Sequence, residues 1–154
     1  MGEILIWRSE WDMNIPDLDA QHHALFDQLN RITMGPDSET KPVEIQQDCR
    51  LLLETFLDKI REHFHAEEKL MADVGFPQLA EHHREHAMLT AELQQLIREV
   101  SQGTETCSAI AHDIKNWYVS HVAMDGKEFS DFFHTKAHTQ ITTHAQKVSS
   151  AGMR

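Results

Sequence analysis

Cysteine, glycine, proline and tyrosine are all scarce in this chain of 154 residues, which has two cysteines, six glycines, four prolines and one tyrosine. Few glycines and prolines leave few positions that interrupt a helix, so the composition favours a helical fold. Neither Cys49 nor Cys107 has a CxxC partner, and we therefore expect no disulfide framework. The length indicates a single domain that can bury its own core.

Long apolar runs and clusters of basic residues are also missing. No stretch approaches the roughly 18 consecutive apolar residues of a membrane span, and the N-terminus lacks the basic start and apolar centre of a signal peptide. Acidic residues outnumber basic ones 25 to 14, giving a formal net charge of -11, so a nucleic-acid backbone would be repelled. We expect a cytoplasmic protein with no membrane and no nucleic-acid partner.

Apolar residues recur at spacings of three and four in four segments that are separated by turn residues. Long helices with short connections favour antiparallel neighbours, so the sequence predicts an all-α, antiparallel up-down-up-down four-helix bundle with an N-terminal arm. The bundle is expected over residues 1–133, with the arm at 1–16, and a C-terminal helical extension or flexible tail at 134–154. The predicted helices cover about 18–33, about 42 to the break at 74–77, 77 to about 103, and 104–106 onward.

Twelve histidines are present, and several lie among the apolar residues of the predicted helices. Burying an unpaired charged group costs several kcal/mol, against a total stability of about 5–15 kcal/mol, so a set of such groups needs compensation. Three pairs are spaced four residues apart, which puts both members on one helix face. The titratable residues on core-facing stripes are His22, His63, Glu67, His82, His86, His121 and Asp125.

One buried histidine, or one His-xxx-His pair, is more often an ordinary structural feature than a ligand. Seven such groups converging from four helices favour a metal centre over a hydrated polar network, and they are too many for one ion, which indicates two. Ferritin-like di-iron bundles need two ExxH motifs, and this chain has one, so a different, histidine-rich class is expected. The remaining histidines, including His23, His65, His83, His112, His134 and His138, are interpreted as surface residues.

Four motifs resemble those of hemerythrins, especially the single-domain bacterial ones, over about residues 5–133. Trp7 and the segment from Ile15 to His22 resemble W…GIxxIDxQH, and His63 to Met71 resembles HFxxEExxM. Phe76-Pro77 followed by His82 to His86 resembles YPxxxxHxxxH, and Trp117 to Val122 resembles WLxxHI. Motifs in this order, one per helix, are specific to the family.

The resemblance implies a cofactor of two non-haem iron ions joined by an oxo or hydroxo bridge. It assigns His82, His86 and His121 to one ion and His22 and His63 to the other, with Glu67 and Asp125 bridging the two. It also implies that O2 binds at an open position of the ion with two histidines. The pocket around that position would be lined by Phe64, Trp117, Tyr118 and Val122.

Two positions depart from the family pattern. The last carboxylate usually follows the fourth-helix histidine by five residues, but here that position is Gly126 and Asp125 comes at four. A spacing of four keeps Asp125 on the face of His121, so we expect Asp125 still to bridge. The simplest explanation of the shorter spacing is that one residue of the family pattern is deleted here. Tyr118 stands where leucine is usual. Its hydroxyl is expected either to point out of the core or to lie near the open iron.

The function implied by the resemblance is O2 binding for storage, delivery or sensing, rather than catalysis. Tyr118 and the altered spacing of Asp125 raise the alternative of a di-iron oxidase, peroxidase or nitric-oxide-handling enzyme. A plain metal-storage or zinc-binding bundle is a third interpretation. The sequence shows no separate general base or substrate cleft, which favours the binding protein.

Overall fold

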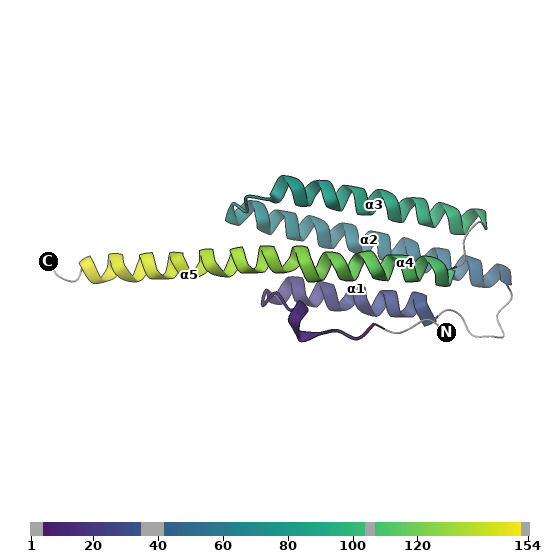
Figure 1. The fold of residues 1–154 in the computed structure, drawn as a ribbon, viewed down its shortest axis with the longest axis horizontal. Coiled ribbons are helices and arrows are strands. Elements are labelled where there is room, and N and C mark those ends of the chain that lie inside the picture. Colours follow the sequence, from purple (N-terminus) through teal and green to yellow (C-terminus); the bar gives the residue numbers. More distant parts are fainter. Residues whose placement is uncertain (1–4, 35–41, 104–106, 152–154) are drawn as a thin grey trace.

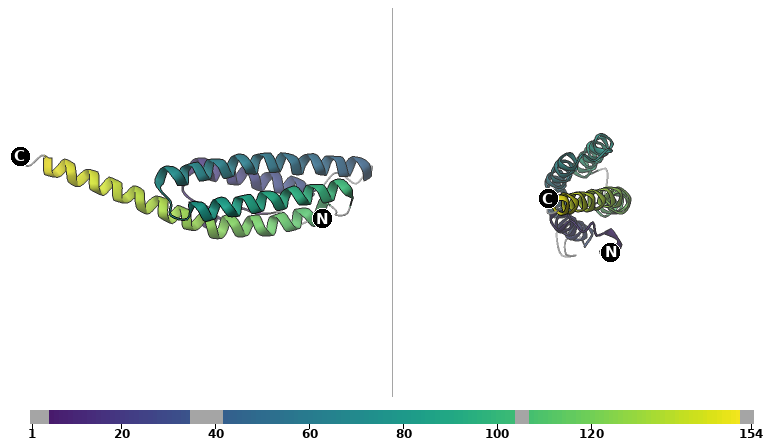
Figure 2. Two further views of the ribbon diagram at one scale, coloured as in Figure 1. Left: turned by 90° about the horizontal axis from the view of Figure 1, so that it is seen from above. Right: turned by 90° about the vertical axis from the view of Figure 1, so that its left-hand side faces the viewer.

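The fold is an antiparallel bundle of helices, and the computed structural model describes residues 5–34, 42–103 and 107–151. Within these ranges there are no strands, so the predicted all-α four-helix bundle is confirmed. Figures 1 and 2 show the four rods of the bundle side by side. The helices are α1 (Pro16–Met34), α2 (Pro42–Val74), α3 (Leu79–Gln102), α4 (Cys107–Ser120) and α5 (Gly126–Ala151).

The fourth rod of the bundle is made by α4, a π-helical turn at His121–Asp125, and the first part of α5. The chain runs through all three without leaving the rod, and the remainder of α5 projects beyond the ends of the other helices (Figure 1). The polar C-terminal segment therefore continues as a helix as far as Ala151. Among the described residues, no helix is long and apolar enough to cross a bilayer.

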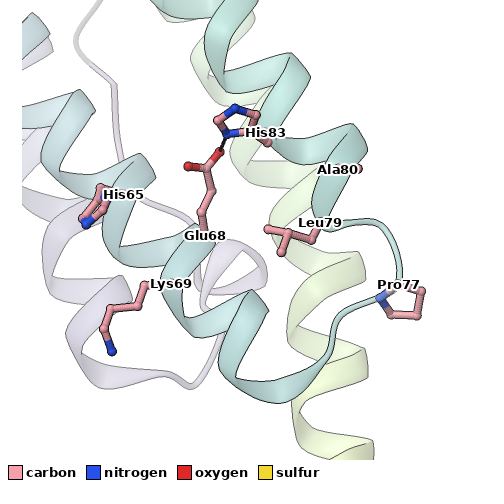
Figure 3. A pocket seen from close by; sticks show the side chains of 7 residues that line it. All are labelled: His65, Glu68, Lys69, Pro77, Leu79, Ala80 and His83. Atoms are coloured by element: carbon pink, nitrogen blue, oxygen red, sulfur yellow. Dashed lines mark hydrogen bonds and ion pairs between the residues drawn. The ribbon is translucent and has the colours of Figure 1, made fainter.

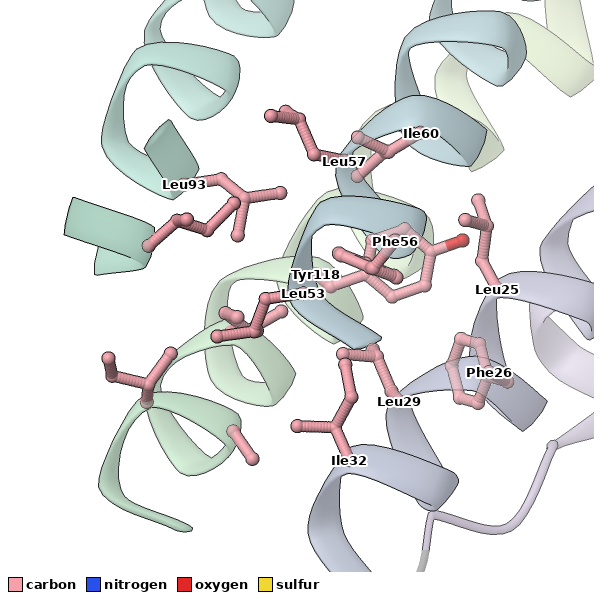
Figure 4. Packing of buried hydrophobic residues seen from close by; sticks show 14 of the residues in the cluster. Leu25, Phe26, Leu29, Ile32, Leu53, Phe56, Leu57, Ile60, Leu93 and Tyr118 are labelled. Carbon is pink, nitrogen blue, oxygen red and sulfur yellow. The ribbon is translucent and has the colours of Figure 1, made fainter. Parts of the chain in front are cut away.

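The apolar core is divided into two clusters along the bundle. The main cluster contains Leu25, Ile60 and Leu93, and is shown in part in Figure 4. The second cluster lies toward the end from which α5 projects, and it contains Leu18 and Met71. The candidate ligands of each rod fall in sequence between residues of the two clusters, so the apolar pattern itself places the polar residues at one level of the bundle.

The N-terminal arm is fixed to the bundle just before α1. The backbone N–H groups of Met13 and Ile15 donate to the Asp19 carboxylate at 2.8 and 3.2 Å, and the Ser130 hydroxyl donates to the carbonyl oxygen of Met13 at 2.7 Å. Asn14, between them, has a positive φ of 54°, a conformation that asparagine tolerates better than most residues. These contacts set the position at which α1 begins, at Pro16, about one and two-thirds turns before His22.

A disulfide joins Cys49 on α2 to Cys107 at the start of α4, with a Cα–Cα distance of 6.0 Å. The expectation that these cysteines would not pair is therefore wrong. Both residues lie on the inward stripe of their helices, and the antiparallel packing brings them to the same level although 58 residues separate them. A search for CxxC spacing cannot detect such a pair.

Candidate metal centre

Six of the seven candidate ligands are buried at the level between the two apolar clusters. Their exposed fractions are no higher than 6%. The six side chains come from all four rods of the bundle, so the packing of the helices determines their relative positions. The six are His22 on α1, His63 and Glu67 on α2, His82 and His86 on α3, and His121 in the π-helical turn.

Glu67 lies between two groups of imidazoles. Its Oε2 is 3.2 Å from Nε2 of His63 and 3.8 Å from Nε2 of His22, while its Oε1 is 3.5 Å from Nε2 of His86. Burial alone would raise the pKa of this carboxyl, but the surrounding imidazoles outweigh burial and hold its pKa well below the usual range. Glu67 is therefore an anion, placed where it can contact ligands on both sides.

The second group of imidazoles comes from α3 and the π-helical turn. Nε2 of His86 lies 3.2 Å from Nε2 of His121, and the ring of His82 is centred 5.9 Å from that of His86. Burial lowers the pKa of His82, as it does that of His63 on the other side. Neutral imidazoles are the form that binds metal ions.

Three of the five imidazoles are held from outside the centre by a side-chain acceptor at Nδ1. Nδ1 of His63 lies 2.8 Å from Oε1 of Gln21, and Nδ1 of His86 lies 3.2 Å from Oε1 of Glu68. Nδ1 of His121 lies 3.0 Å from Oδ2 of Asp125. A bond at Nδ1 fixes the tautomer and leaves Nε2 free to face a metal ion, as in many metal sites.

Glu68 also faces a surface groove between α2 and α3. The exposed His83 bonds to the same Oε1 at 2.8 Å, and Figure 3 shows this contact at the groove beside Leu79 and Pro77. His83 and His65 are exposed, as expected for surface residues. A neighbouring pocket, which shares Glu68 and His83 with this groove, is lined by His86, so Glu68 connects a buried imidazole to the protein surface.

Asp125 lies at the edge of the centre. Its carboxylate bonds to His121, and ligand atoms of Asp125, His121 and Glu85 lie within 4.8 Å of one another. The corresponding sets that include Glu67 do not include Asp125. The spacing of four does keep Asp125 on the face of His121, but the chain forms a π-helical turn there. The bridging role of Asp125 stays a prediction, since the structure shows it as the outer partner of His121.

The ionisation of this pair follows from their contact. The bond from His121 lowers the pKa of Asp125, and the same bond raises the pKa of His121 against the opposing effect of burial. Burial, followed by the charge of Asp125, raises the pKa of Glu85. Asp125 is thus a carboxylate that accepts from His121.

The centre fits a bound cation because its polar atoms are buried without partners of their own. Nδ1 of His22, Nδ1 of His82, Nε2 of His63 and Oε1 of Glu67 are buried and make no hydrogen bond in the described part of the chain. Unpaired polar atoms in a core cost free energy, and coordination of an ion removes part of that cost. Imidazole nitrogen with carboxylate oxygen suits iron, zinc, copper or nickel.

The four residues expected to line the pocket lie around this centre. The ring of Phe64 stacks on His86 with centroids 3.8 Å apart, and Val122 is buried in the main cluster. Trp117 is half-buried, beside a groove that also contains His121 and Asp125. Tyr118 is fully buried.

These features define a four-helix bundle with a buried, histidine-rich cation site. Residues 13–130 match the family described as "Hemerythrin HHE cation binding domain". The chain therefore belongs to the hemerythrin family.

Relatives of known name cover most of the chain. The bacteriohemerythrin of Stenotrophomonas maltophilia is 22% identical over 149 residues, covering 97% of this chain and 92% of that protein. The myohemerythrin of Riftia pachyptila is 25% identical and covers 76% of this chain and 83% of that protein. A crystal structure of wild-type hemerythrin has a TM-score of 0.73 at 22% identity, and the match covers 84% of this chain and 97% of that one. That likeness shows the shared fold.

The sequence patterns did not identify three residues around the ligands. These are Gln21 and Glu68, which bond to Nδ1 of His63 and His86, and Glu85, which lies beside Asp125. Gln21 and Glu68 each adjoin a residue that was selected, His22 and Glu67, and this adjacency was the available signal. Because neighbouring residues on a helix point about 100° apart, one can face the centre while the next reaches the back of a ligand on another helix.

Replacing Glu68 with alanine is expected to weaken binding of a transition-metal ion about 10–100-fold, the usual cost of losing an outer partner of a histidine ligand. His86 would lose the acceptor that orients its ring. The measurement is titration of the metal-free protein with Co²⁺, followed by visible absorption. His65→Ala, an exposed change in the same groove, is the matched control. Equal Co²⁺ affinity in the two variants would show that Glu68 does not position His86.

Proposed function

We propose that this chain holds two non-haem iron ions, joined by an oxo or hydroxo bridge, and binds O2 reversibly for storage, delivery or sensing. The observation that supports it most is the position of Glu67 between two sets of buried imidazoles. His22 and His63 would hold one ion and His82, His86 and His121 the other, with Glu67 between them. The relatives named bacteriohemerythrin and myohemerythrin support the same function.

The protein's own residues supply the surroundings that such a centre needs. Gln21, Glu68 and Asp125 orient three of the ligands through Nδ1. Phe64 covers His86, and Val122 and Tyr118 close the side toward the main cluster. A dry, apolar wall raises the strength of electrostatic contacts inside and keeps bulk water from competing. Two ferrous ions, when bound, would supply the electrons for taking up O2 and recover them on its release.

The test is to load the metal-free protein anaerobically with Fe²⁺, admit O2, and record the visible spectrum through cycles of oxygenation and removal of O2. An absorption band that appears with O2 and bleaches under argon, with two irons per chain, is the expected result. A single irreversible conversion to ferric protein that releases peroxide, or that consumes peroxide when peroxide is added, would favour a di-iron oxidase or peroxidase instead. Failure to take up iron would contradict both.

A further inference from the structure

The hydroxyl of Tyr118 is a buried polar group that the ligand set does not use. Tyr118 is 0% exposed, and its oxygen has no hydrogen-bond partner in the part of the chain that the structure describes. Of the two positions expected for this hydroxyl, the one that points out of the core is therefore wrong. An unpaired hydroxyl in a core lowers stability, which the leucine usual at this position would avoid.

The surroundings of Tyr118 direct its hydroxyl toward one half of the metal centre. The ring packs against Phe26 and Phe56, with centroids 5.4 and 6.1 Å away. Figure 4 shows the oxygen pointing toward Leu25, with Ile60 above it on the neighbouring helix. Leu25 comes three residues after His22 on α1, and Ile60 comes three residues before His63 on α2. The hydroxyl thus faces a space that lies about one helical turn from this pair of histidines, on the side of the main cluster.

The phenol keeps its proton in this place. Burial raises the pKa of Tyr118 well above its usual value, and the charge of Glu67 raises it further. Tyr118 is therefore available as a hydrogen-bond donor.

The half of the centre that Tyr118 faces also has fewer protein ligands. His22 and His63 approach Glu67 from this side, whereas three imidazoles lie on the other. An ion with fewer protein ligands keeps a position for an exogenous molecule, as catalytic metal sites do. The orphan hydroxyl therefore points toward the side of the centre that has fewer protein ligands.

We propose that the Tyr118 hydroxyl donates a hydrogen bond to the small molecule bound on the His22–His63 side. This donor makes the pocket select ligands that accept a hydrogen bond, small anions above all. The proposal rests on the proposed metal centre and deepens it by naming the class of ligand that the site prefers. A pocket with an aliphatic side chain at this position would lack the preference.

The experiment compares wild-type protein with Tyr118→Phe, which retains the ring and removes only the hydroxyl. In the ferric, iron-loaded protein the dissociation constant for azide, from a visible titration, is expected to rise about tenfold or more, because a hydrogen bond to a charged group is lost. In the metal-free protein the melting temperature is expected to stay the same or to rise, since the hydroxyl there has no partner to lose. Neither readout depends on reversible O2 binding.

Tyr118→Leu is the matched second variant, because it also removes the volume of the ring. Equal azide affinity in wild type and Tyr118→Phe, with a change only in Tyr118→Leu, would assign the effect to size and overturn the proposal. A fall of about 4 °C or more in the melting temperature of metal-free Tyr118→Phe would show that the hydroxyl has a protein partner, and would also overturn it. Loss of iron from Tyr118→Phe would make the phenol a ligand rather than a donor.

Discussion

Glu67→Gln is expected to lose the proposed pair of iron ions while the protein stays folded. The carboxylate is the group nearest to both sets of imidazoles, with oxygens 3.2 Å from His63 and 3.5 Å from His86. Glutamine has the same shape, but it replaces an anion by a neutral amide and one acceptor by a donor. Loss of a direct ligand should exceed the roughly 10–100-fold cost of losing an outer partner. Iron per chain, measured after anaerobic loading and desalting, should fall from two to one or none.

The control for this prediction is Glu62→Gln, which makes the same chemical change at an exposed position of the same helix. It should retain two irons per chain. Circular dichroism of both metal-free variants should match that of wild type, because the helices do not depend on this charge. Two tightly held irons in Glu67→Gln would contradict the placement of Glu67 between them.

The fold and the position of the centre could be predicted because both follow from helical periodicity. His22 lies between Leu18 and Leu25, and His63 follows Ile60, so each polar residue interrupts a stripe whose apolar members pack into the two clusters. A residue on such a stripe must be buried wherever the stripe is buried. The inward face of each helix was therefore readable from the sequence alone.

Contacts between helices could not be predicted in the same way. The bond between Gln21 and His63 joins residues 42 positions apart, and that between Glu68 and His86 joins residues 18 apart. Such pairs depend on how far one helix is shifted along its axis relative to its neighbour. The apolar stripes do not determine this shift to better than about one helical turn. The place of Asp125 depends on a π-helical turn, a local change of helical geometry that a period of 3.6 does not reveal.

Family spacing alone also gives an incomplete account of Asp125. The resemblance predicts a second bridge beside Glu67, and that role stays a prediction; the structure adds that the carboxylate bonds to His121 and has Glu85 as its neighbour. This contact is explained without a metal ion. The buried Nδ1 of His121 needs a hydrogen-bond partner, and the Asp125 carboxylate provides one. The sequence motifs thus predict which residues lie near the centre. They predict less well whether a given residue is a metal ligand or an outer partner of a ligand.

Removing the disulfide, by replacing both Cys49 and Cys107 with alanine, is expected to lower the free energy of unfolding by about 4 kcal/mol, as the entropy of closing a loop of this length predicts. The bond links residues separated by 58 positions, so without it the unfolded chain gains many conformations. That loss is large against a total stability of about 5–15 kcal/mol. Urea unfolding without reductant, followed by circular dichroism, measures it.

The same variant should leave the metal centre intact, which separates stability from binding. Cys49 lies 14 residues before His63 on α2, a distance of roughly 20 Å along a helix at 1.5 Å per residue. Iron per chain and azide affinity should therefore equal those of wild type at temperatures where both are folded. Wild-type protein treated with reductant should unfold at the urea concentration of the variant, and reductant should not affect the variant itself. Two free thiols in untreated wild type, with no shift on reduction, would contradict the bond.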